Sequence, residues 1–148
     1  MKKLTAILVA LVLVIGVCVA GTVSASATND ISADFRPPPQ RLSYINYTAT
    51  NIGISGGEAT CTGLVVGYNG TTTKIIITLY LEYKLANSSN WSAYADSSPQ
   101  TTNGSSASLQ MKVSGIPKGY QYRTHAVYKA YAGSAYEILD GYSSVVSY

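Results

Sequence analysis

Apolar and polar side chains alternate with period two along residues 73–85, and this run constrains the fold more than any other feature of the chain. Successive side chains of a β-strand point to opposite faces of its sheet, so the pattern predicts a long, half-buried strand. The odd face is expected to lie in the core. Its members are Ile75, Ile77, Leu79, Leu81, Tyr83 and Leu85, and the even face carries Lys74, Ile76, Thr78, Tyr80, Glu82 and Lys84.

The same alternation recurs farther along the chain, between clusters of Gly, Asn, Ser and Pro, without any apolar repeat of three or four residues. Asn69-Gly70 predicts a hairpin turn, and the polar residues 97–106 predict a loop. Short strands at this spacing predict an all-β fold, in which a β-sandwich of about seven antiparallel strands is favoured over a small barrel. We expect the strands at residues 44–54, 58–66, 73–85, 91–95, 108–113, 120–132, 136–139 and 143–148.

The beginning of the chain has the pattern of a secretory signal peptide. Two lysines follow Met1, residues 4–20 are apolar, and small residues then offer a cleavage site after Ala27, or alternatively after Ala25. A retained membrane anchor is the competing interpretation, because the apolar run approaches the ~18 residues that begin to span a bilayer. We predict a secreted, extracellular protein with a signal peptide at 1–27, a proline-rich leader or linker at 28–41 and one β-sandwich domain at 42–148.

Removal of residues 1–27 leaves eight Lys and Arg against seven Asp and Glu, a net charge of +1. Nucleic-acid binding requires a basic field, so nucleic acid is not an expected partner, nor is a membrane once the signal peptide is cleaved. Cys61 is then the single cysteine, which excludes an intramolecular disulfide. Because Cys61 alternates with Ala59 and Gly63, we expect a buried and slowly reacting thiol rather than an intermolecular bridge.

Catalytic and metal-binding patterns are sparse in this sequence. His125 is the single histidine, so the Cys and His spacings of zinc sites are absent, and alternation places it outward as a lone surface histidine. No G-x-S-x-G motif marks a nucleophile. Glu82 faces outward, Asp96 opens the 97–106 loop, and Asp140 precedes Gly141 in an expected turn, so none of them indicates a catalytic carboxylate pair. We therefore expect a protein that is not an enzyme and uses no metal or cofactor.

Residues 116–132, which begin Ile-Pro-Lys-Gly-Tyr-Gln-Tyr and continue as an alternating strand, resemble the turn and penultimate strand of fibronectin type III and immunoglobulin-like domains. The resemblance implies that Tyr122 closes a corner by hydrogen-bonding its hydroxyl to upstream backbone. More broadly, residues 58–63, residues 77–79 and the approach to Trp91 resemble small secreted single-domain proteins of Gram-positive, clostridial-type bacteria. That similarity implies localisation and fold, and no activity.

Tyrosine is the unusual component: the chain has 13, against one Phe and one Trp. Tyrosine suits half-exposed sheet positions and recognition surfaces alike, because it combines apolar area with a polar tip. If strands 73–85 and 120–132 pair, their outward residues form one face, which is either an ordinary solvated sheet or a flat recognition surface in which Tyr80 and Tyr131 cluster. The candidate binding residues on or near this face are Ile76, Tyr80, Trp91, Tyr94, His125 and Tyr131.

Three classes of function remain open at this point. The first is a non-catalytic binding or adhesion module at a cell surface that contacts glycan or protein through the aromatic sheet face. The second is a self-assembling structural surface protein, in which an edge strand or the leader pairs with the next subunit. The third is a secreted hydrolase or inhibitor, which would need a deep pocket with converging carboxylates or a rigid protruding loop.

Overall fold

A computed structural model describes residues 42–148, and within this range the chain forms nine β-strands and no helix. The expected signal peptide at 1–27 and leader at 28–41 lie outside the described residues. Between residues 42 and 148, no helix is long and apolar enough to cross a membrane. The strands are β1 (Ile45–Ser55), β2 (Glu58–Gly67), β3 (Lys74–Leu85), β4 (Ser92–Asp96), β5 (Gln100–Asn103), β6 (Ser106–Ser114), β7 (Tyr120–Ala132), β8 (Ala135–Tyr142) and β9 (Val146–Ser147).

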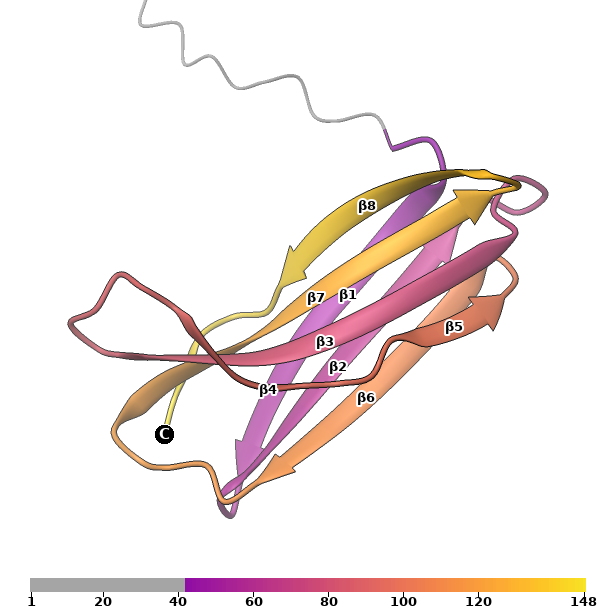
Figure 1. Cartoon of the computed structure of the whole chain (residues 1–148). Helices are drawn as coiled ribbons and strands as arrows, with labels where there is room; N and C mark the ends of the chain where they lie inside the picture. Colours follow the sequence, from indigo (N-terminus) through magenta and orange to yellow (C-terminus); the bar gives the residue numbers. More distant parts are fainter. Residues whose placement is uncertain (1–41) are drawn as a thin grey trace, which may run out of the picture. The chain divides into compact units, whose positions relative to one another are not determined.

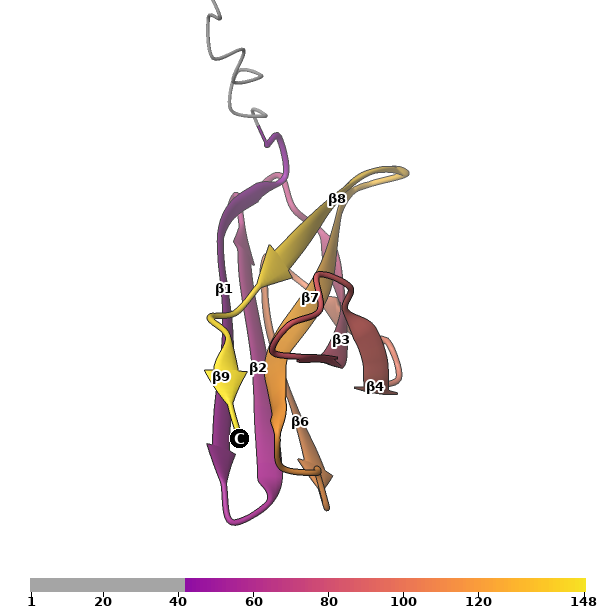
Figure 2. The same ribbon diagram turned by 90° about the vertical axis from the view of Figure 1, so that its left-hand side faces the viewer.

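The strands pair in two antiparallel sheets (Figure 1). One sheet has the order β1-β2-β6 and the other the order β4-β3-β7-β8, with β5 also paired to β3 and β9 also paired to β7. Figure 2 shows the two sheets as layers that face each other. The prediction of an all-β fold with antiparallel strands is confirmed.

The core lies between the two sheets and is built from the inward positions of the alternating strands. On β3, Ile75, Ile77, Leu79 and Leu81 are fully buried, as the period-two pattern predicts. Burial of each such side chain stabilises the fold by roughly 1.5–3 kcal/mol. The expectation fails at the end of the strand, where Leu85 is 58% exposed. The remaining buried apolar residues come from the other strands and their connections: Ile45, Ala59, Cys61, Val65, Ala107, Ile116, Tyr122, Ala126, Tyr128 and Ala130.

Tyr128 connects the two sheets through its hydroxyl group. Its Oη donates to the carbonyl oxygen of Ala49 at 2.9 Å and shares a 2.7 Å hydrogen bond with the hydroxyl of Thr50, both on β1. The ring fits because Gly63 and Gly141 lie against it without side chains. A Cβ at Gly63 would lie 3.1 Å from the Tyr128 hydroxyl, and one at Gly141 would lie 2.8 Å from Tyr128 Cε2. These two glycines therefore make room for the Tyr128 ring within strands, and neither of them serves to form a turn.

Tyr122 makes the corner hydrogen bond that its sequence context implies. The buried Tyr122 hydroxyl donates to the carbonyl oxygen of Pro117 at 2.7 Å and so fixes the connection from β6 to β7. Positive φ angles of 75° at Gly115 and 88° at Gly119 allow the backbone to turn there. Burial raises the pKa of Tyr122 above that of an exposed tyrosine.

Cys61 is fully buried on β2, beside Ala59 and Gly63 on the inward face. Burial raises the pKa of its thiol, and a hydrogen bond with Thr124 acts in the opposite direction. A thiol with these properties packs as a small apolar group and is a weak nucleophile.

Two sequence expectations about turns and loops are wrong. Residues 97–106 are not only a loop, because β5 pairs with the first four residues of β3, Lys74 to Ile77. Backbone hydrogen bonds hold this polar edge strand, and they require no apolar pattern. Asn69-Gly70 lies in a tight turn in which the Tyr68 carbonyl accepts the N–H groups of Thr71 and Thr72. That turn is no hairpin, however, because β2 and β3 belong to different sheets.

The end of the chain also differs from the expectation. Instead of one strand over residues 143–148, only β9 at Val146–Ser147 pairs with β7. The expected turn at Asp140-Gly141 is absent, because β8 continues through both residues to Tyr142. Gly141 indicated a turn in the sequence, whereas in the structure it lies opposite Ala126 within the sheet and leaves room for Tyr128.

Candidate functional site

The candidate site lies on the solvent-facing side of the β4-β3-β7-β8 sheet, which we call the outer face. In Figure 1 this sheet lies in front of β1-β2-β6. The register of β3, β7 and β8 brings Tyr80, His125 and Tyr142 into one row across the sheet, because Tyr80 lies opposite His125 and His125 opposite Tyr142. A second row, one pleat away, pairs Glu82 with Arg123.

Five planar side chains pack in succession across these rows, and we call them the aromatic stack: Trp91, Arg123, Tyr142, His125 and Tyr80. The His125 ring stacks on Tyr142 at 4.6 Å between centroids and 16° between planes, and on Tyr80 at 5.4 Å and 29°. The Arg123 guanidinium lies 4.3 Å from the Trp91 centroid and 4.4 Å from that of Tyr142. Stacked rings and cation–π contacts of this kind contribute about 0.5–1.5 kcal/mol each.

Two carboxylates, those of Glu82 and Asp140, hold Arg123 and His125 in place. Arg123 Nε donates to Glu82 Oε2 at 2.6 Å, and His125 Nδ1 lies 3.2 Å from Glu82 Oε1. The other ring nitrogen, His125 Nε2, lies 2.8 Å from Asp140 Oδ1. Both ring nitrogens can donate at once only in the protonated imidazolium, which would form ion pairs with both carboxylates. The result is a ring fixed on two edges and stacked on two faces.

The members of the stack differ in their exposure to solvent. Tyr142 is 51% exposed, whereas only 19% of the His125 side chain is accessible. Arg123 and Glu82 are mostly covered as well. The site therefore presents an exposed aromatic ring supported by a charged layer, which suits contact with a ligand. Among residues 42–148, no group of three or more His, Cys, Asp and Glu side chains is arranged to hold a metal ion.

The structure brings some of the sequence-predicted residues together. Tyr80, His125 and Trp91 all belong to the stack. The interpretation of His125 as a lone surface histidine is wrong, since its ring is mostly covered and both nitrogens face carboxylates. Ile76 lies on the same face, opposite Lys129 and away from the stack.

Tyr131 and Tyr94 lie elsewhere. Tyr131 is six residues from His125 along β7, or roughly 20 Å at ~3.3 Å per residue, so it forms no cluster with Tyr80. It packs on Tyr136 instead, at 5.5 Å between centroids. Tyr94 is directed away from the outer face. Its ring makes edge contacts with the rings of Tyr83 and Tyr122, at 5.7 and 6.4 Å between centroids.

Sequence reasoning missed Arg123, Tyr142 and Asp140 as site residues. The outward direction of Arg123 follows from its alternation with His125, but its contacts with Trp91 and Tyr142 do not. Tyr142 and Asp140 were obscured by Gly141, which indicated a turn. The signal that identifies them is the alternation Tyr136, Ile138, Asp140, Tyr142, which shows that β8 continues to Tyr142 and that these four residues share the outer face.

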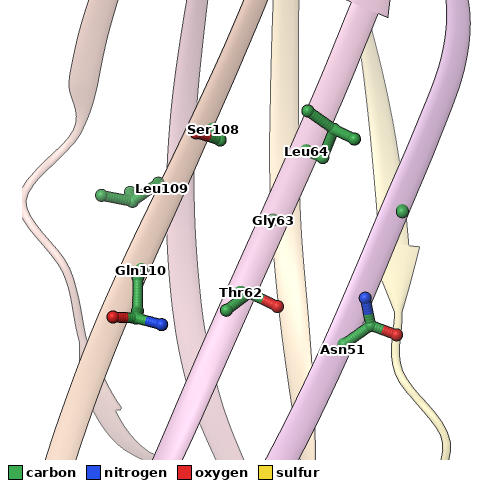
Figure 3. Close-up of a pocket in the computed structure, with 8 residues that line it drawn as sticks. Asn51, Thr62, Gly63, Leu64, Ser108, Leu109 and Gln110 are labelled. Carbon is green, nitrogen blue, oxygen red and sulfur yellow. The ribbon is translucent and has the colours of Figure 1, made fainter.

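A separate shallow pocket of about 340 Å³ lies on the opposite sheet, on the outward side of β1, β2 and β6 (Figure 3). Its lining is uncharged and has no aromatic ring, so it offers shape and neutral hydrogen bonding but no acid, base or stacking group. The lining residues are Ala49, Asn51, Thr62, Gly63, Leu64, Ser108, Leu109 and Gln110. We therefore place the candidate site at the aromatic stack.

Comparison with known proteins adds little to this geometry. No protein-family model matches the chain, and no curated protein matches it. A solved structure described as the crystal structure of a protein from Archaeoglobus fulgidus is similar over 70% of this chain and 97% of that chain. Its sequence identity is 14% and its TM-score 0.37, so neither fold type nor function is inferred from it.

Proposed function

We propose that the protein is a secreted, non-catalytic binding module that contacts its ligand at a cell surface through the outer face. The observation that carries this proposal is the aromatic stack, in which the exposed Tyr142 ring is backed by His125 and Arg123. Side chains already fixed by stacking and by Glu82 lose little conformational freedom on binding, which favours affinity. Tyrosine and tryptophan are also the residue types that most often dominate binding energy.

Glycan is the ligand class that we favour over protein. The stack lies on a sheet face and combines the exposed Tyr142 ring with charged oxygen and nitrogen atoms. The apolar face of a sugar ring can stack on Tyr142, while sugar hydroxyls can hydrogen-bond to the half-exposed Asp140 carboxylate.

We also propose that the fold is of the fibronectin type III or immunoglobulin-like type. Two features support this. The three-plus-four strand order, β1-β2-β6 against β4-β3-β7-β8, is of the kind found in such sandwiches. In addition, Tyr122 near the start of β7 bonds to backbone five residues upstream, as the tyrosine corner of those domains does.

Secretion is part of the proposal and rests on the signal-peptide pattern of residues 1–27. The Gram-positive origin rests on the local sequence resemblance described above. Secretion is tested by recovering the protein from the medium of an expressing bacterium and sequencing its N-terminus. We expect it to begin at Thr28 or Ser26, and full-length chain in the membrane fraction would contradict the secretion proposal.

Substitutions in the aromatic stack test the binding role. Tyr142→Ser and Trp91→Ser should each weaken binding to a glycan array or to whole cells by about tenfold or more, while circular dichroism shows that both variants remain folded at the assay temperature. Tyr47→Ser is the matched control, because Tyr47 is an equally exposed tyrosine, at 56%, on the other sheet. If both stack variants bind as the parent does, the stack is not the binding site.

A further inference from the structure

The outer face has a second cluster at its other end, which we call the basic patch: Lys74, Lys129, Tyr131 and Tyr136. Lys74 Nζ lies 3.8 Å from the Tyr131 ring centroid, and Lys129 Nζ lies 5.0 Å from the same centroid and 3.8 Å from that of Tyr136. Two ammonium groups thus share one ring. Tyr136 is 53% exposed, so the patch is open to solvent.

No carboxylate among the described residues neutralises these two charges. The ion pairs between residues 42 and 148 involve Lys112, Arg123 and His125, and neither Lys74 nor Lys129 is among them. The interaction of Lys129 with Tyr131 raises the pKa of the ammonium group, although slight burial opposes the effect. Between residues 42 and 148, therefore, neither lysine has a carboxylate partner.

The nearest acidic residue in sequence is directed elsewhere. Glu137 follows Tyr136 on β8, and its side chain lies on the inward side of that strand. Its carboxylate accepts the backbone N–H groups of Ser43 at 2.8 Å and Tyr44 at 2.6 Å, and also that of Ile45. Glu137 thus fixes the start of β1 and forms no ion pair with the two lysines of the basic patch.

We propose that the basic patch is a second subsite that binds the anionic group of an acidic glycan, a carboxylate or a sulfate. Two ammonium groups and two tyrosine hydroxyls supply charge-assisted hydrogen bonds to such an oxyanion. This inference rests on the proposed function, because the same glycan would place its sugar rings on the aromatic stack and its acid group on the basic patch. Both sites lie along one strand, β7.

A nucleic acid fits this patch less well than an acidic glycan. Single-stranded nucleic acids stack their bases on open aromatic faces along a basic groove. Here Lys74 covers one face of Tyr131, and Lys129 lies over Tyr136. The net charge of +1 after removal of residues 1–27 also offers no extended basic field.

The test measures binding of the secreted protein to polygalacturonate, dextran sulfate, neutral dextran and a single-stranded oligodeoxynucleotide. The parent should bind one or both acidic polysaccharides about tenfold more tightly than dextran, and added salt should remove the difference. The double variant Lys74→Gln with Lys129→Gln should lose that preference. Lys118→Gln is the control, because Lys118 also lies over a tyrosine, Tyr148 at 5.6 Å, but outside the patch.

Each result that differs from these expectations contradicts one specific claim. An unchanged preference in the double variant, an equal loss in Lys118→Gln, or equal binding of acidic and neutral polymers by the parent would overturn the inference. Equally tight binding of the oligodeoxynucleotide would overturn the choice of glycan. Loss of the acid preference in the double variant, together with unchanged binding in Tyr142→Ser, would support the basic patch and contradict the proposed role of the stack.

Discussion

Replacement of Tyr128 by phenylalanine should destabilise the fold more than any other loss of a single tyrosine hydroxyl. The Tyr128 side chain is fully buried, and its hydroxyl bonds to the Ala49 carbonyl and the Thr50 hydroxyl across the two sheets. Tyr128→Phe keeps the ring and leaves these partners behind. A buried polar group without a partner costs about 1–3 kcal/mol, so we expect a loss of about 2 kcal/mol in the free energy of unfolding.

Urea denaturation followed by circular dichroism measures this loss. With an m-value of about 2 kcal/mol per molar urea, the midpoint should fall by about 1 M while the slope stays the same. Tyr47→Phe is the control, since Tyr47 is exposed and the change should stay within about 0.5 kcal/mol. Thr50→Val combined with Tyr128→Phe should cost less than the two single changes added together, because they share one hydrogen bond.

The same residue predicts a pH dependence at alkaline pH. Burial raises the pKa of Tyr128 above the value of about 10 that it has in the unfolded chain. Above about pH 10 the folded chain therefore holds a proton that the unfolded chain has released, so stability falls as the pH rises. The parent should therefore lose stability faster than Tyr128→Phe as the pH rises above about 10. A Tyr128→Phe midpoint equal to that of Tyr47→Phe at neutral pH would refute the inter-sheet role of the hydroxyl.

Three further predictions concern the core. Tyr122→Phe should lower the free energy of unfolding by about 0.5–1.5 kcal/mol through loss of the bond to Pro117, and an unchanged urea midpoint would contradict that contribution. Cys61 should react with a thiol reagent only at the rate of global or local opening, so fast labelling of native protein would be inconsistent with burial. Gly141→Ala should cost about 1–3 kcal/mol by overpacking against Tyr128, and a thermal midpoint equal to the parent's would show that the ring can move aside.

Most of the strands could be predicted from the sequence because they carry their own period-two signal. The expected and observed bounds of β7 agree, and those of β2 and β3 agree within a residue. β5 was missed because its four residues are all polar, and an edge strand is held by backbone bonds that leave no pattern in the side chains. The exposed end of β3 at Leu85 was missed for a related reason, since alternation does not show where the opposite sheet stops.

The aromatic stack was harder to predict because its members meet only through long-range register. The outward direction of Tyr80 and His125 follows from alternation within each strand. Their position in one row with Tyr142 follows from pairing between β3, β7 and β8, which no local pattern specifies. Tyr131 illustrates the same limit, because it lies on the correct face but six residues away from the row that matters.

Gly141 connects the packing of the core with the geometry of the candidate site. It lies in β8 between Asp140 and Tyr142, and both neighbours contact His125 on the outer face. A side chain at Gly141 would meet the Tyr128 ring and the Thr50 hydroxyl on the inner face. Because successive residues of a strand point to opposite sides, any shift of β8 that relieves the inner contact also moves Asp140 and Tyr142 relative to the histidine. The buried tyrosine therefore sets the position of the strand that carries the exposed one, and the geometry of the aromatic stack depends on how the core is packed.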